Sequence, residues 1–61
     1  MMNDFSKSLV NLSVIELQEC LSNLYGERDS AAQEQDASRI NVCDIRIAAV
    51  NDEIGKRMEG N

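Results

Sequence analysis

The stretch INVCDIRIAAVNDEIGKRM, residues 40–58, decides the fold of this chain. Its apolar side chains recur at alternating intervals of three and four residues, which places one per turn on a single side of a helix. They are Ile40, Cys43, Ile47, Val50 and Ile54. Because isoleucine and valine supply most of this row, it is typical of a surface that packs against another helix. We therefore predict a helix over about 37–58.

A second helical signal begins at Ser13. Ser13 and Glu16 match the S-x-x-E pattern of a capping box, in which each side chain accepts a hydrogen bond from the backbone N–H of the other residue. Leu12 and Leu17 occupy the two positions of a hydrophobic staple around the same cap. Both motifs indicate Ser13 as the N-cap of a helix over about 14–34.

The turn between the two helices has two candidate positions. Gly26 is one, because glycine readily takes the left-handed conformation that follows a helix. The polar run at 34–36 is the other, with Asp36 as the N-cap of the second helix. A turn near Gln35 matches more layers of the two apolar rows and gives two helices of about 20 residues, each about 30 Å long. We favour this later turn.

The later turn predicts an all-α fold, an antiparallel helical hairpin of helices at about 14–34 and 37–58. Residues 13–61 form the hairpin, and residues 1–12 form a flexible arm or a short helix. Phe5 either packs on the end of the hairpin or anchors a partner. The seam between the two helices is predicted to consist of Leu17, Leu21, Leu24, Ala31, Ile40, Cys43, Ile47, Val50 and Ile54.

The small size of the chain predicts that it needs a partner. Its 61 residues make one domain at most, and below roughly 70–80 residues a core is usually supplemented by disulfides, a metal or another chain. Two cysteines without a signal peptide indicate a reducing cytoplasm. Without histidine, two separated cysteines do not make a structural zinc site. Another chain remains as the supplement.

Apolar residues off the seam predict where that other chain binds. The candidate oligomer interface consists of Ile15, Cys20, Val42 and Ile45. A lone hairpin would leave these side chains in water, whereas a second hairpin would cover them. We therefore predict a homodimer or higher oligomer, most simply two hairpins that form a four-helix bundle.

The sequence lacks the patterns of an enzyme. It has no histidine, which closes several routes to general base catalysis, and it has no P-loop or G-x-G-x-x-G motif to hold a phosphate. We expect no catalytic residue, cofactor or metal site. No apolar run approaches the roughly 20 residues of a membrane span. The leading prediction is a non-enzymatic protein–protein interaction or regulatory module in the cytoplasm.

Nucleic-acid binding is the alternative prediction. Its candidate contacts are the basic residues of the second helix, Arg39, Arg46, Lys56 and Arg57. The net charge of −5 opposes binding to phosphate backbones. The four basic residues also lack the interleaved aromatic side chains on which bases stack.

The runs LYGERDSAAQEQDASRI (24–40) and RIAAVNDEIGKR (46–57) carry a resemblance. They resemble the small early accessory proteins of lambda-type phages, which are encoded between the exonuclease and excisionase genes. The resemblance implies a protein of the host cytoplasm that acts on host replication or phage development by contacting a host or phage protein. It implies no catalytic residues. The expected architecture is also similar to plasmid copy-number regulators of the Rop type, which are RNA-binding hairpin dimers, but this chain lacks a basic, aromatic RNA-facing stripe.

Overall fold

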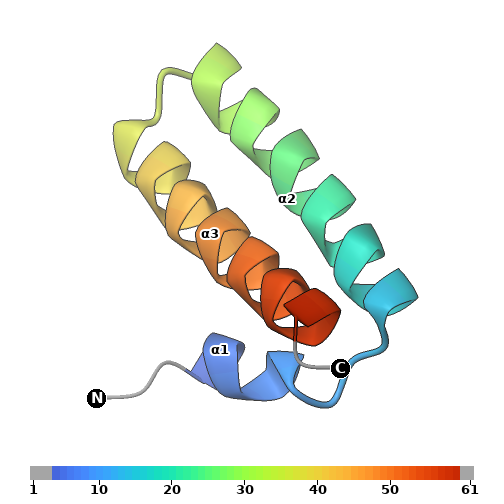
Figure 1. Cartoon of the computed structure of the whole chain (residues 1–61). Helices are drawn as coiled ribbons and strands as arrows, with labels where there is room; N and C mark the ends of the chain where they lie inside the picture. Colours follow the sequence, from blue (N-terminus) through green and yellow to red (C-terminus); the bar gives the residue numbers. More distant parts are fainter. Residues whose placement is uncertain (1–3, 60–61) are drawn as a thin grey trace.

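The computed structural model describes residues 4–59, which form three helices (Figure 1). They are α1 (Asp4–Leu9), α2 (Val14–Gln33) and α3 (Ala37–Glu59). The two long helices, α2 and α3, pack against each other in opposite directions, and α1 packs mainly on α3 (Figure 1). The predicted all-α helical hairpin is therefore confirmed for the described residues. Its assembly into a four-helix bundle stays a prediction.

The N-terminus of α2 is held by the predicted capping box. Ser13 Oγ accepts a hydrogen bond from the Glu16 N–H at 3.1 Å, and Glu16 Oε1 accepts one from the Ser13 N–H at 2.8 Å. Leu12, just before the cap, is half-buried against the core. These local interactions satisfy backbone groups that the first turn of a helix leaves unpaired, and so they set the start of α2.

The turn between α2 and α3 lies at 34–36, as favoured from the sequence. The Asp36 N–H donates to the Ala31 carbonyl at 2.9 Å, and the Gln35 N–H donates to the Ala32 carbonyl at 3.1 Å. This pair of bonds defines a Schellman motif, which ends a helix with a residue in the left-handed conformation. That residue is Gln35, with φ of 58°.

α3 begins directly after this turn. Asp36 Oδ1 accepts a hydrogen bond from the Arg39 N–H at 3.2 Å, which is the geometry of an N-cap. Gly26, the other candidate turn, lies inside α2 with open space where a side chain would begin. α2 therefore continues past Gly26 because nothing there interrupts its hydrogen bonds.

We expect Gln35→Gly to stabilise the protein. An L-residue in the left-handed region costs about 1–2 kcal/mol, and glycine removes most of that cost while adding some chain entropy to the unfolded state. The expected gain in the free energy of unfolding is about 0.5–1 kcal/mol, measured by urea denaturation followed by circular dichroism. Gln33→Gly, in the helical last turn of α2, is the matched control and should destabilise instead. A loss of stability in both variants would contradict the role of Gln35.

The core lies between α2 and α3 and is closed at one side by α1. Leu17 and Val50 are its largest fully buried side chains. Each seam residue predicted from the sequence is buried or half-buried. The buried side chains of the described residues are Leu9, Leu17, Leu24, Ala31, Cys43, Ile47 and Val50.

The N-terminal region contributes to the core through α1. Leu9 is almost fully buried and belongs to the same cluster as Leu17 and Val50. Phe5 packs against that cluster, and the Arg46 guanidinium lies over its ring, 5.3 Å from the centroid. Of the two sequence interpretations of Phe5, the structure therefore has the one in which it packs on the hairpin.

Candidate interaction surface

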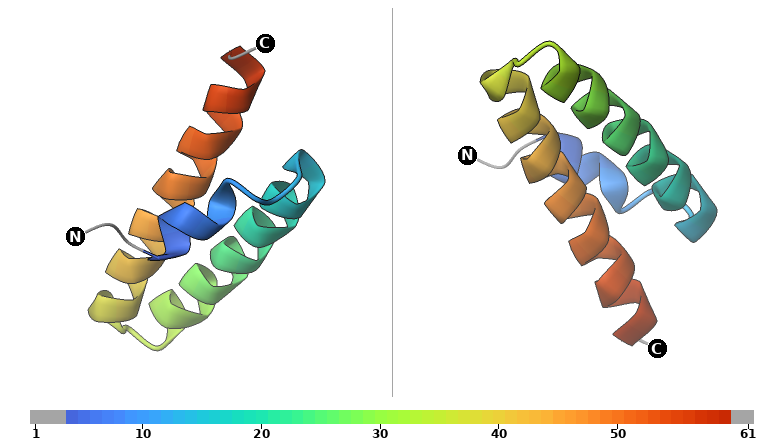
Figure 2. Two further views of the ribbon diagram at one scale, coloured as in Figure 1. Left: turned by 90° about the horizontal axis from the view of Figure 1, so that it is seen from below. Right: turned by 90° about the horizontal axis from the view of Figure 1, so that it is seen from above.

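The two broad sides of the hairpin differ, because α1 crosses only one of them. Seen from below, α1 lies in front of α2 and α3, whereas from above the two long helices lie side by side with α1 behind them (Figure 2). On α3, the residues that meet α1 recur at intervals of three and four. They are Arg46, Ala49, Glu53 and Arg57, which contact α1 or line a groove with it.

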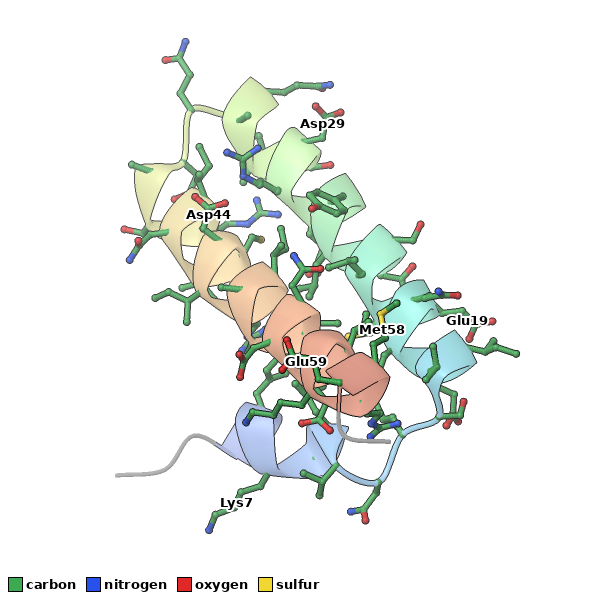
Figure 3. The ribbon with its side chains drawn as sticks, in the orientation of Figure 1. Lys7, Glu19, Asp29, Asp44, Met58 and Glu59 are labelled. Atoms are coloured by element: carbon green, nitrogen blue, oxygen red, sulfur yellow. The ribbon has the colours of Figure 1, made fainter. Side chains whose placement is uncertain are left out.

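Helix geometry then identifies the residues on the other side. Five residues turn an α-helix by about 140° beyond a full circle. Met58 is therefore rotated by that angle from Glu53, and Tyr25 by the same angle from Cys20, which is half-buried against the core. Met58 extends from the last turn of α3 toward α2, on the side away from α1 (Figure 3).

We call this surface the open face and define it by its apolar residues. Three of them are large and solvent-exposed: Met58 is 78% exposed, Tyr25 50% and Val14 41%. The other three are half-buried seam residues whose outer edges reach the same surface. The open face consists of Val14, Leu21, Tyr25, Ile40, Ile54 and Met58.

The open face carries little charge in a chain whose net charge is −5. Its charged residues are Arg28 of α2 and Asp44 of α3, which form an ion pair across the two helices. Asp29 lies at its rim, where it accepts a hydrogen bond from the Gln33 side chain at 3.5 Å. Because one cation and one anion cancel, the centre of this face is close to neutral.

The four residues predicted as an oligomer interface do not gather on one surface. Ile15, 69% exposed, lies on the outer side of α2, and Ile45, 56% exposed, lies on the outer side of α3. Val42 is exposed on the flank of α3 that also carries Arg46, and Cys20 is half-buried against the core. The sequence reasoning grouped these four residues because they lie off the seam, without separating the two sides of the hairpin. The spacing of Val14, Leu21 and Tyr25, by seven and by four, is the signal that it missed.

The four basic residues considered for nucleic-acid contacts each face a partner within the chain. Their separation along α3 is large, since Arg39 lies near the turn and Arg57 near the other end. Arg46 lies over the Phe5 ring. The ion pairs are Arg39 with Glu34 at 2.8 Å, Lys56 with Asp52 at 3.3 Å and Arg57 with Glu53 at 3.1 Å. The structure thus does not combine them into one solvent-facing cationic surface.

Arg57 has a role that sequence reasoning did not find. Its guanidinium donates to the carbonyl oxygens of Leu9 at 2.9 Å, Val10 at 3.3 Å and Leu12. These carbonyls belong to the end of α1 and the segment after it, where a helix leaves acceptors unpaired. Arg57 therefore caps α1 from α3. From the sequence, Arg57 is interpreted as a candidate nucleic-acid contact and as a possible i,i+4 partner of Glu53.

Neither a metal site nor a disulfide occurs among the described residues. Cys20 and Cys43 are both free thiols, and no three histidine, cysteine or acidic residues converge there as a metal site would require. Within the same part of the chain, no helix has the length and apolar character to cross a membrane. The open face is therefore the surface on which the functional interpretation is based.

Comparison with known proteins gives no relative of this chain. No model of a protein family, no curated protein and no solved structure matches it. The class of the protein, three helices built on a helical hairpin within residues 4–59, therefore rests on the fold alone.

Proposed function

We propose that this chain is a small, non-enzymatic protein-interaction module that binds another protein chain through the open face. The observation that carries the proposal is the position of Val14, Tyr25 and Met58, which gather on the one side of the hairpin that α1 does not cross. Isolated exposed apolar residues are common, but a contiguous set marks an interaction site.

The composition of the open face supports protein binding. The central parts of protein interfaces are depleted in charged residues and enriched in aromatic residues, methionine and arginine. Here Tyr25 and Met58 provide the apolar area, and Arg28 is neutralised by Asp44. Tyrosine is also among the residues that contribute most to binding energy. A nucleic acid would instead need positive charge on this face.

The proposal extends to a regulatory role. The resemblance to early accessory proteins of lambda-type phages supports a protein that acts on host replication or phage development by occupying a surface of a host or phage protein. A chain of this size can act by binding alone, without catalysis, and it would do so in the host cytoplasm.

Site-specific photo-crosslinking tests the binding face. A photoreactive phenylalanine analogue is placed at Tyr25 in cells that produce the full chain, and cross-linked species are identified by mass spectrometry. The matched control carries the same analogue at Ile15, which is exposed on the outer side of α2. We expect a discrete cross-linked protein, of either the same or a different sequence, from position 25 and none from position 15.

Two results would overturn the proposal. Without a cross-link from either position, the open face is not a protein-binding surface. With a cross-link from position 15 alone, the interface lies on the outer side of α2, where Ile15 of the sequence-predicted set is exposed.

A further inference from the structure

We infer that the occupant of the open face is a second copy of this chain, packed face to face about a two-fold axis that runs along the hairpin between α2 and α3. This inference rests on the proposed function, because it names the partner of the same face. Each α2 would then lie over the α3 of the other copy, which gives a four-helix arrangement with α1 on the two outer sides.

The area of the face suits such a dimer. The structure measures 40 × 26 × 16 Å along its principal axes. With a helix length of about 30 Å and two helices side by side at about 10 Å each, the open face presents roughly 600 Å² of projected area. Two such faces bury about 1,200 Å² in total, which reaches the lower end of specific protein–protein interfaces. The other sides of the hairpin are narrower or are occupied by α1.

The small core gives a reason for the second copy. A core in which Leu17 and Val50 are the largest fully buried side chains is thin for independent stability. The half-buried residues Leu21, Ile40 and Ile54 have outer edges on the open face. A second copy would remove those edges from water and convert half-buried seam residues into buried ones, so the same contact would stabilise both hairpins.

Under this symmetry the charged residues of one open face lie opposite residues of the opposite charge on the other copy. Two chains of net charge −5 repel each other, so self-association requires a face without excess negative charge. Arg28 and Asp44 pair across α2 and α3 and therefore lie at the same level along the hairpin. The two-fold axis would place the Arg28 of each copy over the Asp44 of the other, which makes an alternating square of four charges.

The same symmetry also brings together apolar residues at the end of the hairpin that lies away from the turn. Val14 begins α2 and Met58 lies in the last turn of α3, so both are at the end away from the turn. Under the same axis the Val14 of one copy would pack on the Met58 of the other. Tyr25 lies between this apolar end and the ion pair, near the middle of the interface.

Charge exchange between two variants tests the inference. Sedimentation equilibrium of the full chain should give about twice the chain mass of 6.8 kDa. Arg28→Glu makes the pair doubly negative and Asp44→Arg makes it doubly positive, so each variant alone should dimerise at least about tenfold more weakly. An equimolar mixture of the two variants should recover the dimer, because each negative pair meets a positive one.

Two control variants separate the open face from general charge effects. Arg39→Glu and Asp52→Arg change the net charge by the same amounts, but their ion pairs lie off the open face. Both should dimerise like the unaltered chain. Circular dichroism should show that all four variants remain folded, since half-exposed ion pairs contribute little stability.

The outcomes distinguish this inference from the proposed function. An unaltered chain that is monomeric up to millimolar concentration overturns the second copy, while a cross-link from position 25 to another protein would still support the binding face. A dimer that Arg28→Glu leaves intact, or a mixture that does not re-associate, overturns the two-fold arrangement. Failure of the cross-link at position 25 overturns both.

Discussion

Val50→Asp is expected to unfold the chain at room temperature. Val50 is fully buried between α2 and α3 and belongs to the cluster that contains Leu17 and Leu24. A carboxylate without a partner at this position must be desolvated, at a cost of several kcal/mol. The whole core of a chain this small supplies about 3–5 kcal/mol. The substitution therefore removes most or all of the net stability.

The helical signal in circular dichroism measures this effect. Ile45→Asp is the matched control, because it introduces the same side chain into the same helix at an exposed position. We expect the control to change the free energy of unfolding by no more than about 0.5 kcal/mol. If Val50→Asp retains a cooperative thermal transition close to that of the control, then the α2–α3 contact is not the core of this protein.

Arg57→Met is expected to release α1 from the hairpin. Methionine keeps the aliphatic stem but loses the donors to the Leu9, Val10 and Leu12 carbonyls and the ion pair with Glu53. Hydrogen bonds from a charged donor contribute about 1.5–3 kcal/mol each when partly buried. Because several are lost together and α1 can partly rehydrate, we expect the free energy of unfolding to fall by about 2–3 kcal/mol.

Hydrogen exchange gives this effect a local signature. The backbone amides at the end of α1 should exchange much faster in Arg57→Met, while those in the middle of α2 and α3 keep most of their protection. Lys56→Met is the control, because the Lys56–Asp52 pair is largely exposed and contributes little. Equal protection of α1 in both variants would show that Leu9 and Phe5 alone hold it in place.

Much of the hairpin follows from short-range patterns. The capping box at Ser13 and the N-cap at Asp36 involve residues three apart, and both occur as predicted. The apolar rows of α2 and α3 determine which side of each helix is buried, because a helix has only one period. The choice of Gln35 over Gly26 also followed from those rows, since only the later turn aligns them over their full length.

The open face did not follow from the sequence, and the reason is geometric. Periodicity shows which side of each helix meets the other, but not which flank of the pair receives a third element. Phe5 and Leu9 place α1 on one flank because they pack there. Arg57 holds α1 in that position by donating hydrogen bonds to carbonyls more than 40 positions earlier in the chain. Grouping Ile15, Cys20, Val42 and Ile45 therefore combined residues that lie on different surfaces.

By itself, the sequence determined the two long helices, their ends and the seam between them, because caps and apolar periodicity act over a few residues. Only the tertiary structure decided the rest. It placed α1 on one side of the hairpin through contacts between the two ends of the chain, and it thereby left Val14, Tyr25 and Met58 exposed together on the other. The stretch at 40–58 encodes a helix with a single apolar row that packs on α2. The position of α1 then decides which flank of that helix is covered and which is exposed.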